Sequence, residues 1–216
     1  MAPPSPAAAD LLGALPVALR TLAGRGVQRS YRKGTLIIEE GSHGDTLYLL
    51  LRGQVKAFSS DARGREVTYG VYGAGDYFGE MSLDGGPRAA SVIAESACVC
   101  VVLTRQNLRE HIAAEPEFAF EVIGRVIRRA RLATQGARSM ALLDVYGRVV
   151  QLLESLAVAQ ADGSRVIAER PTHAEIASRV GCSREMVSRL MKDLERGDYV
   201  VRDGAGLALR QMPAHW

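Results

Sequence analysis

Apolar positions recur every three or four residues on both sides of Gly181, and this spacing predicts two short amphipathic helices between Pro171 and Leu194. Thr172 and Glu175 have the spacing of a capping box, which starts the first helix by satisfying its unpaired backbone N–H groups. Gly181 can adopt the left-handed conformation that ends this helix. The apolar residues of the first helix that we expect to be buried are Ala174, Ile176, Ala177 and Val180.

The second predicted helix begins after Ser183, whose side chain can cap it. Its inward face is formed by Val187, Leu190, Met191 and Leu194. The opposite face carries Arg184, Glu185, Ser188 and Arg189 near the N-terminal end. Two helices joined in this way form a helix-turn-helix, in which the second helix enters the major groove of DNA.

The side chains on this outer face suit the reading of bases. Arginine can bond guanine O6 and N7 bidentately, and a glutamate can accept from cytosine N4. Because a carboxylate gains nothing from nearby phosphates, Glu185 favours base readout over unspecific attraction to DNA. The alternative is that these residues are solvated charges on a surface helix. Base readout is favoured because the charges occur together with the helix caps, the turn glycine and the inward face of a helix-turn-helix. The predicted DNA-binding residues are Thr172, Ser183, Arg184, Glu185, Ser188 and Arg189.

The stretch from Val180 to Glu185, followed by Arg189, resembles the DNA-binding element of the Crp/Fnr superfamily of bacterial transcription regulators. In that family the residues that match Arg184, Glu185 and Arg189 read a TGTGA-type half-site, so the resemblance implies a similar palindrome in duplex DNA. It also implies a winged helix, whose two closing strands fit residues 199–202 and 207–211 around a turn at 203–206.

Between residues 27 and 104 the chain has short apolar runs separated by glycines, which is typical of an antiparallel β-roll. The expected strands are 36–38, 46–51, 54–59, 66–72, 89–95 and 99–103. Cys98 and Cys100 alternate in the last run and therefore share one face. We interpret them as two small core residues rather than as a metal or redox pair.

The segment from Phe78 to Val92 resembles the phosphate-binding cassette of cyclic-nucleotide domains. Backbone amides of a short helical turn after Gly79 favour an anion, and Arg88 offers a planar fork for a cyclic phosphate. Glu80 can accept from a ribose 2'-hydroxyl, although Glu80 and Arg88 taken alone could also form an internal salt bridge. The predicted ligand-binding residues here are Gly79, Glu80, Met81, Ser82, Arg88 and Ala89.

The cassette departs from the common pattern at two places. Ala89 stands where many cassettes have a serine or threonine hydroxyl for the phosphate, and the loop from Glu80 to Arg88 is short. Loss of one neutral hydrogen bond costs about 0.5–1.5 kcal/mol, so the expected effect is weaker affinity rather than its loss. Cyclic AMP is the first choice of allosteric effector. Cyclic di-GMP, another effector, and ligand-independent DNA binding with a vestigial cassette stay open.

One long helix is predicted over 117–143, with a hinge at its end. Steps of four and three residues give it the seam of a two-stranded coiled coil, formed by Ala119, Ile123, Val126, Ala130, Ala133, Ala137 and Met140. A palindromic site requires a two-fold protein, which favours a homodimer over packing of this stripe on the chain's own barrel. Alignment with the family hinge makes Arg129 and Thr134 further ligand candidates. The alternative is that both residues are solvent-exposed positions of the helix without a part in ligand binding.

Composition and length are compatible with two modules. The 216 residues are 47% hydrophobic and carry a net charge of only +3, so overall charge does not reveal a DNA-binding protein. We expect an α+β fold with an N-terminal β-roll, a long dimerisation helix and a C-terminal winged helix-turn-helix. The expected segments are a disordered lead at 1–10, the roll with flanking helices at 11–116, the helix and hinge at 117–143, and the DNA-binding domain at 144–216.

The same composition argues against several other classes. No apolar run reaches the ~18 residues of a membrane span, and residues 1–9 lack the features of a secretory signal, so we expect a cytoplasmic protein. The four histidines are widely separated and lack metal-ligand spacing, so we expect no metal, no tightly bound cofactor and no enzyme. A haem or iron-sulfur sensor of the same superfamily is a rival interpretation, and the absence of cysteine before Cys98 argues against the iron-sulfur branch. RNA polymerase is an expected partner, with the turn at 160–165 as one surface.

Overall fold

The computed structural model describes residues 11, 13, 15, 17–161 and 164–210. The predicted lead at 1–10 and the last residue of the second predicted wing strand, Gln211, lie outside the described residues. The chain divides into two compact units, one comprising 1–59 and 68–131 and the other 60–67 and 132–216. Each unit is described by itself below.

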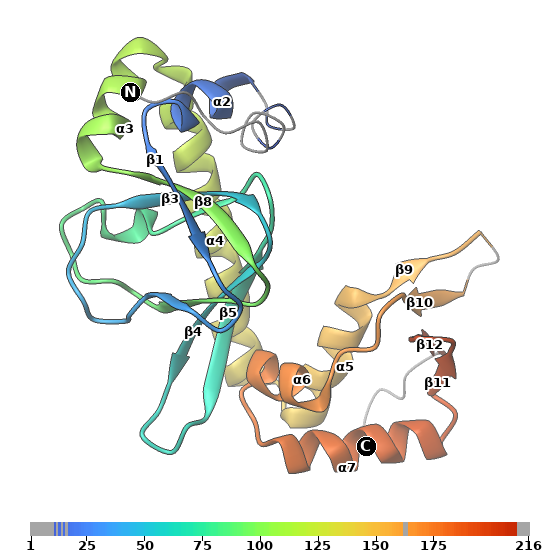
Figure 1. Ribbon diagram of the computed structural model, residues 1–216. Helices are drawn as coiled ribbons and strands as arrows, with labels where there is room; N and C mark the ends of the chain where they lie inside the picture. Colours follow the sequence, from blue (N-terminus) through green and yellow to red (C-terminus); the bar gives the residue numbers. More distant parts are fainter. Residues whose placement is uncertain (1–10, 12, 14, 16, 162–163, 211–216) are drawn as a thin grey trace. The chain divides into compact units, whose positions relative to one another are not determined.

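The first unit is built on two four-stranded sheets that form the predicted β-roll (Figure 1). One sheet has the order β1 (Val27–Tyr31), β8 (Cys98–Leu103), β3 (Leu47–Arg52) and β6 (Tyr77–Phe78). The other has the order β2 (Leu36–Ile38), β7 (Ser91–Ala94), β4 (Val55–Ser60) and β5 (Glu66–Tyr72). The pairings of β8 with β1 and β3, and of β7 with β2 and β4, are antiparallel.

Strand β8 separates two hydrophobic cores. Cys98 and Cys100 lie in one core with Ile38 and Phe78, whereas alternate residues of the same strand lie in the other core with the helices of this unit. The predicted alternation of the two cysteines is therefore confirmed. Burial, with a smaller contribution from Cys98, raises the pKa of the Cys100 thiol to about 12, which leaves it protonated and unreactive.

The sequence missed or misjudged some strands of the roll. β1 was missed because its residues are polar and mostly exposed, and β6 because it has only two residues. The strand predicted at 89–95 is shorter, Ser91–Ala94, because residues 89 and 90 form a bend beside the cassette.

The first unit contains the helices α2 (Val17–Ala23) and α3 (Arg105–Ala114) and the start of α4 (Glu117–Leu142). Thr104 and Asn107 form a capping box at the start of α3. α4 confirms the predicted long helix, which ends one residue earlier than expected. Phe118 is the residue by which α4 enters the core of the roll.

The second unit contains α5 (Val145–Leu156), α6 (His173–Val180) and α7 (Arg184–Arg196). Its sheet has four strands in the order β11 (Val200–Asp203), β12 (Gly206–Leu209), β10 (Arg165–Ile167) and β9 (Val158–Ala159). The sequence predicted only the first two. Asp203 pairs with Gly206, so the turn is narrower than expected and consists of residues 204 and 205.

The helix-turn-helix packs as predicted except at one residue. Ile176, Ala177 and Val180 of α6 are buried against α7, but Ala174 is exposed, so its predicted burial is wrong. The reason is geometric, because Ala174 lies about 100° around the helix from the direction in which the buried residues point. On α7 Val187, Met191 and Leu194 are fully buried, and Leu190 is half-buried at the edge of the same core.

Candidate functional site

The cassette begins with a turn that only glycine fits. Gly79 has a φ of +88°, and a Cβ at this position would lie 2.8 Å from both Nη1 of Arg88 and the carbonyl oxygen of Thr46. A single 3-10 turn, η1 (Glu80–Ser82), follows, and the Ser82 hydroxyl donates back to the Gly79 carbonyl over 3.2 Å. The turn therefore places Glu80 inward and leaves Met81 exposed.

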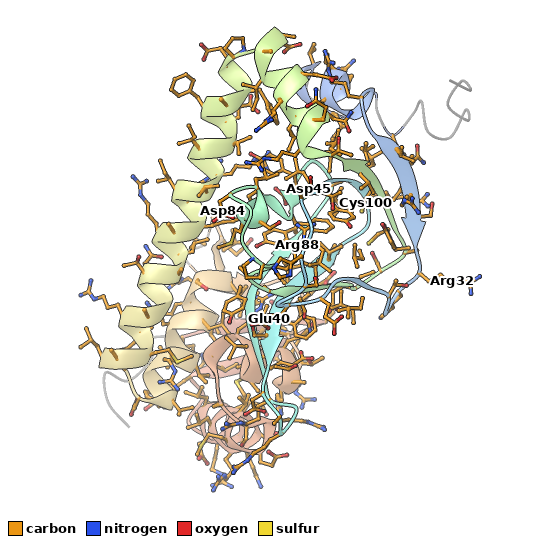
Figure 2. The ribbon with its side chains drawn as sticks, turned by 90° about the vertical axis from the view of Figure 1, so that its left-hand side faces the viewer. Arg32, Glu40, Asp45, Asp84, Arg88 and Cys100 are labelled. Atoms are coloured by element: carbon orange, nitrogen blue, oxygen red, sulfur yellow. The ribbon has the colours of Figure 1, made fainter. Side chains whose placement is uncertain are left out.

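Arg88 lies inside the roll (Figure 2) and is almost fully buried. Its Nη1 donates to the carbonyls of Thr46 at 3.0 Å and Gly79 at 2.8 Å, and its Nη2 donates to Oγ1 of Thr46 at 2.9 Å. Burial lowers the pKa of Arg88, with Asp45 and Glu80 among the groups that oppose the shift, yet a guanidinium keeps its charge in proteins. Within the described part of the chain its hydrogen-bond partners are neutral oxygens, so this cation suits an anionic ligand.

Glu80 is the second buried charge of the cassette. Its Oε1 accepts from Nη1 of Arg129 on α4, while its Oε2 is buried and has no hydrogen-bond partner among the described residues. The salt bridge between Glu80 and Arg88, which the sequence left open, is therefore replaced by a pair with Arg129. Arg129 also donates to the Tyr77 carbonyl at 2.5 Å and stacks on the ring of Tyr72 at 4.5 Å.

The structure thus brings Gly79, Glu80, Ser82, Arg88 and Arg129 together. The remaining candidates lie differently. Ala89 is exposed. Thr134 is an exposed residue of α4 in the segment that belongs to the second unit, so its part in ligand binding stays a prediction. Thr46, which bonds Arg88 from strand β3's start, was missed, because no local spacing links it to the cassette.

In the second unit the predicted helix caps are present. Oγ1 of Thr172 accepts from the Glu175 amide at 3.2 Å, and the Thr172 amide donates to Oε2 of Glu175 at 2.6 Å. Gly181 has a φ of +69°, and Oγ of Ser183 accepts from the Met186 amide at 3.2 Å. The local geometry of the helix-turn-helix therefore follows from its sequence.

Three residues of the predicted reading face, Arg184, Glu185 and Arg189, are exposed on α7. The carboxylate of Glu185 accepts hydrogen bonds at the start of α7. The bond from its own backbone N–H has the largest effect and the bond from the Ser183 side chain the next largest, and both lower the pKa of Glu185 and keep it ionised. Ser188 is half-buried, and its Oγ lies 2.8 Å from Nδ1 of His173, a contact that the sequence did not predict.

The residues of the predicted seam on α4 are largely exposed. Ile123 is 51% exposed and Val126 41% exposed, whereas Phe118, Arg125 and Arg129 are among the residues of α4 that contact the roll. Most of the other seam positions are also exposed, namely Ala130, Ala133, Ala137 and Met140, and Ala119 is half-buried. At Ile123 and Val126, therefore, the seam does not pack on the chain's own roll.

Comparison with known proteins agrees with both units. Residues 28–115 match the family model of the cyclic nucleotide-binding domain, and residues 147–214 match that of the Crp-like helix-turn-helix domain. The cAMP-activated global transcriptional regulator CRP of Salmonella typhimurium is 30% identical over 181 residues, which cover 81% of this chain and 85% of the relative. The chain belongs to the Crp/Fnr family of transcription regulators.

Two further proteins are similar to this chain over most of its length. The CRP-like cAMP-activated global transcriptional regulator of Mycobacterium tuberculosis is 30% identical over 201 residues, which cover 91% of this chain and 90% of the relative. The structure of the c-di-GMP responsive global regulator CLP of Xanthomonas campestris has a TM-score of 0.77 and 23% sequence identity to this chain. The match covers 90% of this chain and 99% of CLP. At that identity the likeness of CLP shows the fold alone.

This Crp/Fnr family member is thus a DNA-binding transcription regulator with a cyclic nucleotide-binding domain. The family is one of regulators rather than of enzymes. Among the described residues no cluster of three or more histidine, cysteine, aspartate or glutamate side chains could hold a metal ion. No helix of the described chain is both long and apolar enough to cross a membrane.

Proposed function

We propose that this Crp/Fnr regulator acts as a homodimer, binds a TGTGA-like palindrome in duplex DNA, and is controlled by a cyclic nucleotide, with cyclic AMP as the first candidate. The observation that carries the ligand part is that one cassette holds two buried charges, Arg88 and Glu80, that are not paired with each other. Arg88 bonds only neutral oxygens among the described residues, and Oε2 of Glu80 has no partner there.

Both groups fit a cyclic nucleotide. A buried guanidinium attracts a cyclic phosphate strongly because the surrounding dielectric is low. An orphaned carboxylate oxygen in the same place is costly unless a donor reaches it, and a ribose 2'-hydroxyl is such a donor. Arg129 holds the other oxygen of Glu80, so the carboxylate is oriented before a ligand arrives.

The choice of nucleotide rests on relatives and on Ala89. Relatives at 30% identity are named as cAMP-activated, and CLP is named as c-di-GMP responsive. Ala89 cannot supply the hydroxyl that many cassettes offer to the phosphate, so we expect weaker affinity for cyclic AMP than a cassette with serine would have. Cyclic di-GMP is the alternative effector, and ligand-independent DNA binding is the alternative mode.

The DNA part of the proposal rests on α7. Arg184, Glu185 and Arg189 project from one exposed face near the start of the helix, where a helix-turn-helix contacts bases. Two copies of α7 about 34 Å apart would match two half-sites one turn apart. The exposed apolar residues Ile123 and Val126 of α4 support pairing of two chains through this helix.

Control requires that the ligand binds one arrangement of the protein better than another, because equal affinity would shift nothing. Within the second unit, Arg148 of α5 links the end of α4 to the helix-turn-helix. Its Nη1 donates to the Leu143 carbonyl and its Nε to the Val180 carbonyl, each at 2.9 Å. A change at the hinge near 141–145 would therefore reach the turn before α7 directly.

Calorimetric titration with cyclic AMP, cyclic GMP and cyclic di-GMP tests the effector, and a gel shift with a TGTGA palindrome, with and without each nucleotide, tests the control. We expect cyclic AMP to bind and to strengthen the shift of a dimer. If only cyclic di-GMP binds, cyclic di-GMP is the effector and the proposal of cyclic AMP is wrong. An equally strong shift without any nucleotide, together with no heat of binding, would overturn cyclic-nucleotide control.

As a transcription regulator acting on chromosomal DNA, the protein is proposed to work in the cytoplasm and to contact RNA polymerase. The candidate surface for that contact is the segment 160–165, of which residues 162 and 163 lie outside the described residues. The Gln160 amide donates to the Ser164 carbonyl over 2.8 Å. A two-hybrid assay against polymerase subunits, with a Gln160→Ala variant, tests it.

A further inference from the structure

One hydrogen bond crosses from the first helix of the helix-turn-helix to the second. His173 is the first residue of α6, and its Nδ1 lies 2.8 Å from Oγ of Ser188 on α7. We infer that His173 is a positioning residue for base recognition, which fixes the Ser188 hydroxyl as a hydrogen-bond donor toward the major groove. The inference rests on the proposed DNA-binding role of α7.

The surroundings of the imidazole decide which nitrogen carries the proton. Nε2 of His173 is buried and has no partner in the described part of the chain. A buried N–H without an acceptor is rarer in proteins than a buried acceptor without a donor, so the proton belongs on Nδ1. Ser188 supplies the only acceptor that the described residues offer to it.

The imidazole is neutral at neutral pH. Burial lowers the pKa of His173, and the positive charges of Arg170 and Arg184 act in the same direction, while Glu195 opposes them. These are the charged groups that face the ring from α6's start and from α7. The neutral ring with its proton on Nδ1 therefore donates to Ser188 rather than accepting from it.

This direction determines what Ser188 can read. Once Oγ accepts from His173, the hydroxyl hydrogen is directed to another acceptor, and no hydrogen bond to a further group occupies it among the described residues. Ser188 lies one helical turn after Arg184, on the same face as the exposed reading residues. A donor at this place favours N7 and O6 of guanine, N7 of adenine or O4 of thymine, whereas an acceptor would favour the amino groups of adenine or cytosine.

The tautomer can be measured without DNA. Long-range 1H–15N spectra of the imidazole at pH 7.5, in the full-length protein, distinguish a proton on Nδ1 from one on Nε2. We expect Nδ1 to be protonated in the wild type. A proton on Nε2 would overturn the inference, whatever the DNA-binding result.

The effect on base preference is measured by selection from a randomised half-site with the full-length protein. We compare the wild type with Ser188→Ala, His173→Phe, His173→Asn and the double variant Ser188→Ala/His173→Phe. Phenylalanine keeps a ring but removes both nitrogens, and the asparagine amide can place a donor near the position of Nδ1. His111→Phe makes the same change in the other unit and is the matched control.

We expect Ser188→Ala and His173→Phe to lose preference at the same single base position, by about two- to tenfold, which corresponds to one neutral hydrogen bond. His173→Asn should keep most of it, and the double variant should resemble Ser188→Ala. A uniform loss of affinity at all positions in His173→Phe, or a further loss in the double variant, would show a merely structural role and overturn the inference. If the wild type selects no sequence, the proposed DNA function fails, and the tautomer measurement still decides the donor assignment.

Discussion

Arg129 of α4 forms an ion pair with Glu80 of the cassette, from which it is separated by 49 positions in the chain. The side chain of Glu80 is only 2% exposed, and that of Arg129 is 22% exposed. The pair therefore fastens the long helix to the cassette inside the first unit. A ligand that reaches Oε2 of Glu80 would act on a group that α4 already holds.

Replacing Arg129 by methionine should destabilise the first unit, because a buried carboxylate then loses its charged partner. We expect a loss of about 1.5–3 kcal/mol in the free energy of unfolding, measured by urea denaturation. The double variant Arg129→Met/Glu80→Gln should recover part of that loss. Arg128→Met, which changes an exposed neighbour on α4, serves as the control and should cost little. If Arg129→Met and Arg128→Met lose the same free energy of unfolding, the pair of Arg129 with Glu80 does not stabilise the first unit.

Arg88→Gln should abolish the stimulation of DNA binding by nucleotide while leaving basal DNA binding unchanged. The amide retains polar atoms for the carbonyls of Thr46 and Gly79, but it carries no charge for a phosphate. The measurement is a titrated gel shift with and without cyclic AMP. Arg32→Gln is the control, because Figure 2 shows this side chain extending away from the roll. Unchanged stimulation in Arg88→Gln would remove Arg88 from the ligand site.

Glu185→Ala should relax the preference for one base of the half-site, because a carboxylate that accepts from cytosine N4 is lost. Each such contact contributes roughly 1–3 kcal/mol of discrimination. Selection from a randomised half-site measures the change. Lys192→Ala, further along α7 and exposed, should lower affinity without changing the selected sequence. If Glu185→Ala selects the wild-type sequence, the residue does not read a base.

His111 should make the first unit less stable in mild acid. The ring is fully buried, neither of its nitrogens has a partner among the described residues, and its centroid lies 4.8 Å from that of the Phe118 ring in an edge-to-face contact. Burial lowers the pKa of His111 below its ordinary value of 6.5, with Arg25 acting in the same direction and Glu115 and Glu121 opposing. As the pH falls below 6.5, the unfolded chain takes up a proton before the folded chain does, so stability is lost.

Urea denaturation of the wild type and of His111→Phe at pH 7.5 and 5.5 measures this effect. The wild type should lose more stability between the two pH values than the variant, because the variant has no imidazole to protonate. His173→Phe makes the same change in the second unit, where the pKa of the half-buried imidazole is also lowered, and it should leave the pH dependence of the first unit unchanged. An identical pH dependence in the wild type and His111→Phe would rule out the contribution of His111.

Ile123→Glu should weaken the proposed dimer, since it places a charge in the apolar seam of α4. Sedimentation at micromolar concentration should show a shift toward the monomer, and the variant should lose the higher affinity that a dimer has for a palindrome over an isolated half-site. Gln135→Glu adds the same charge at an exposed position on the opposite side of α4 and should leave the dimer intact. A dimer that survives Ile123→Glu would place the two-fold contact elsewhere.

Several features of this protein are determined by the sequence itself. The caps at Thr172 and Ser183, the left-handed turn at Gly181 and the inward face of α7 were predicted correctly, as was the length of α4 to within one residue. The reason is that capping, left-handed turns and helical periodicity depend on residues only a few positions apart.

Contacts between distant segments were decided only by the tertiary structure. From the sequence, Glu80 could have paired with Arg88, eight positions away, but it pairs with Arg129 on α4. The contact of Ser188 with His173 likewise depends on how α6 and α7 pack against each other. Local spacing fixes the conformation of each element and the residues that share its face, whereas the packing of elements selects which buried polar group meets which partner.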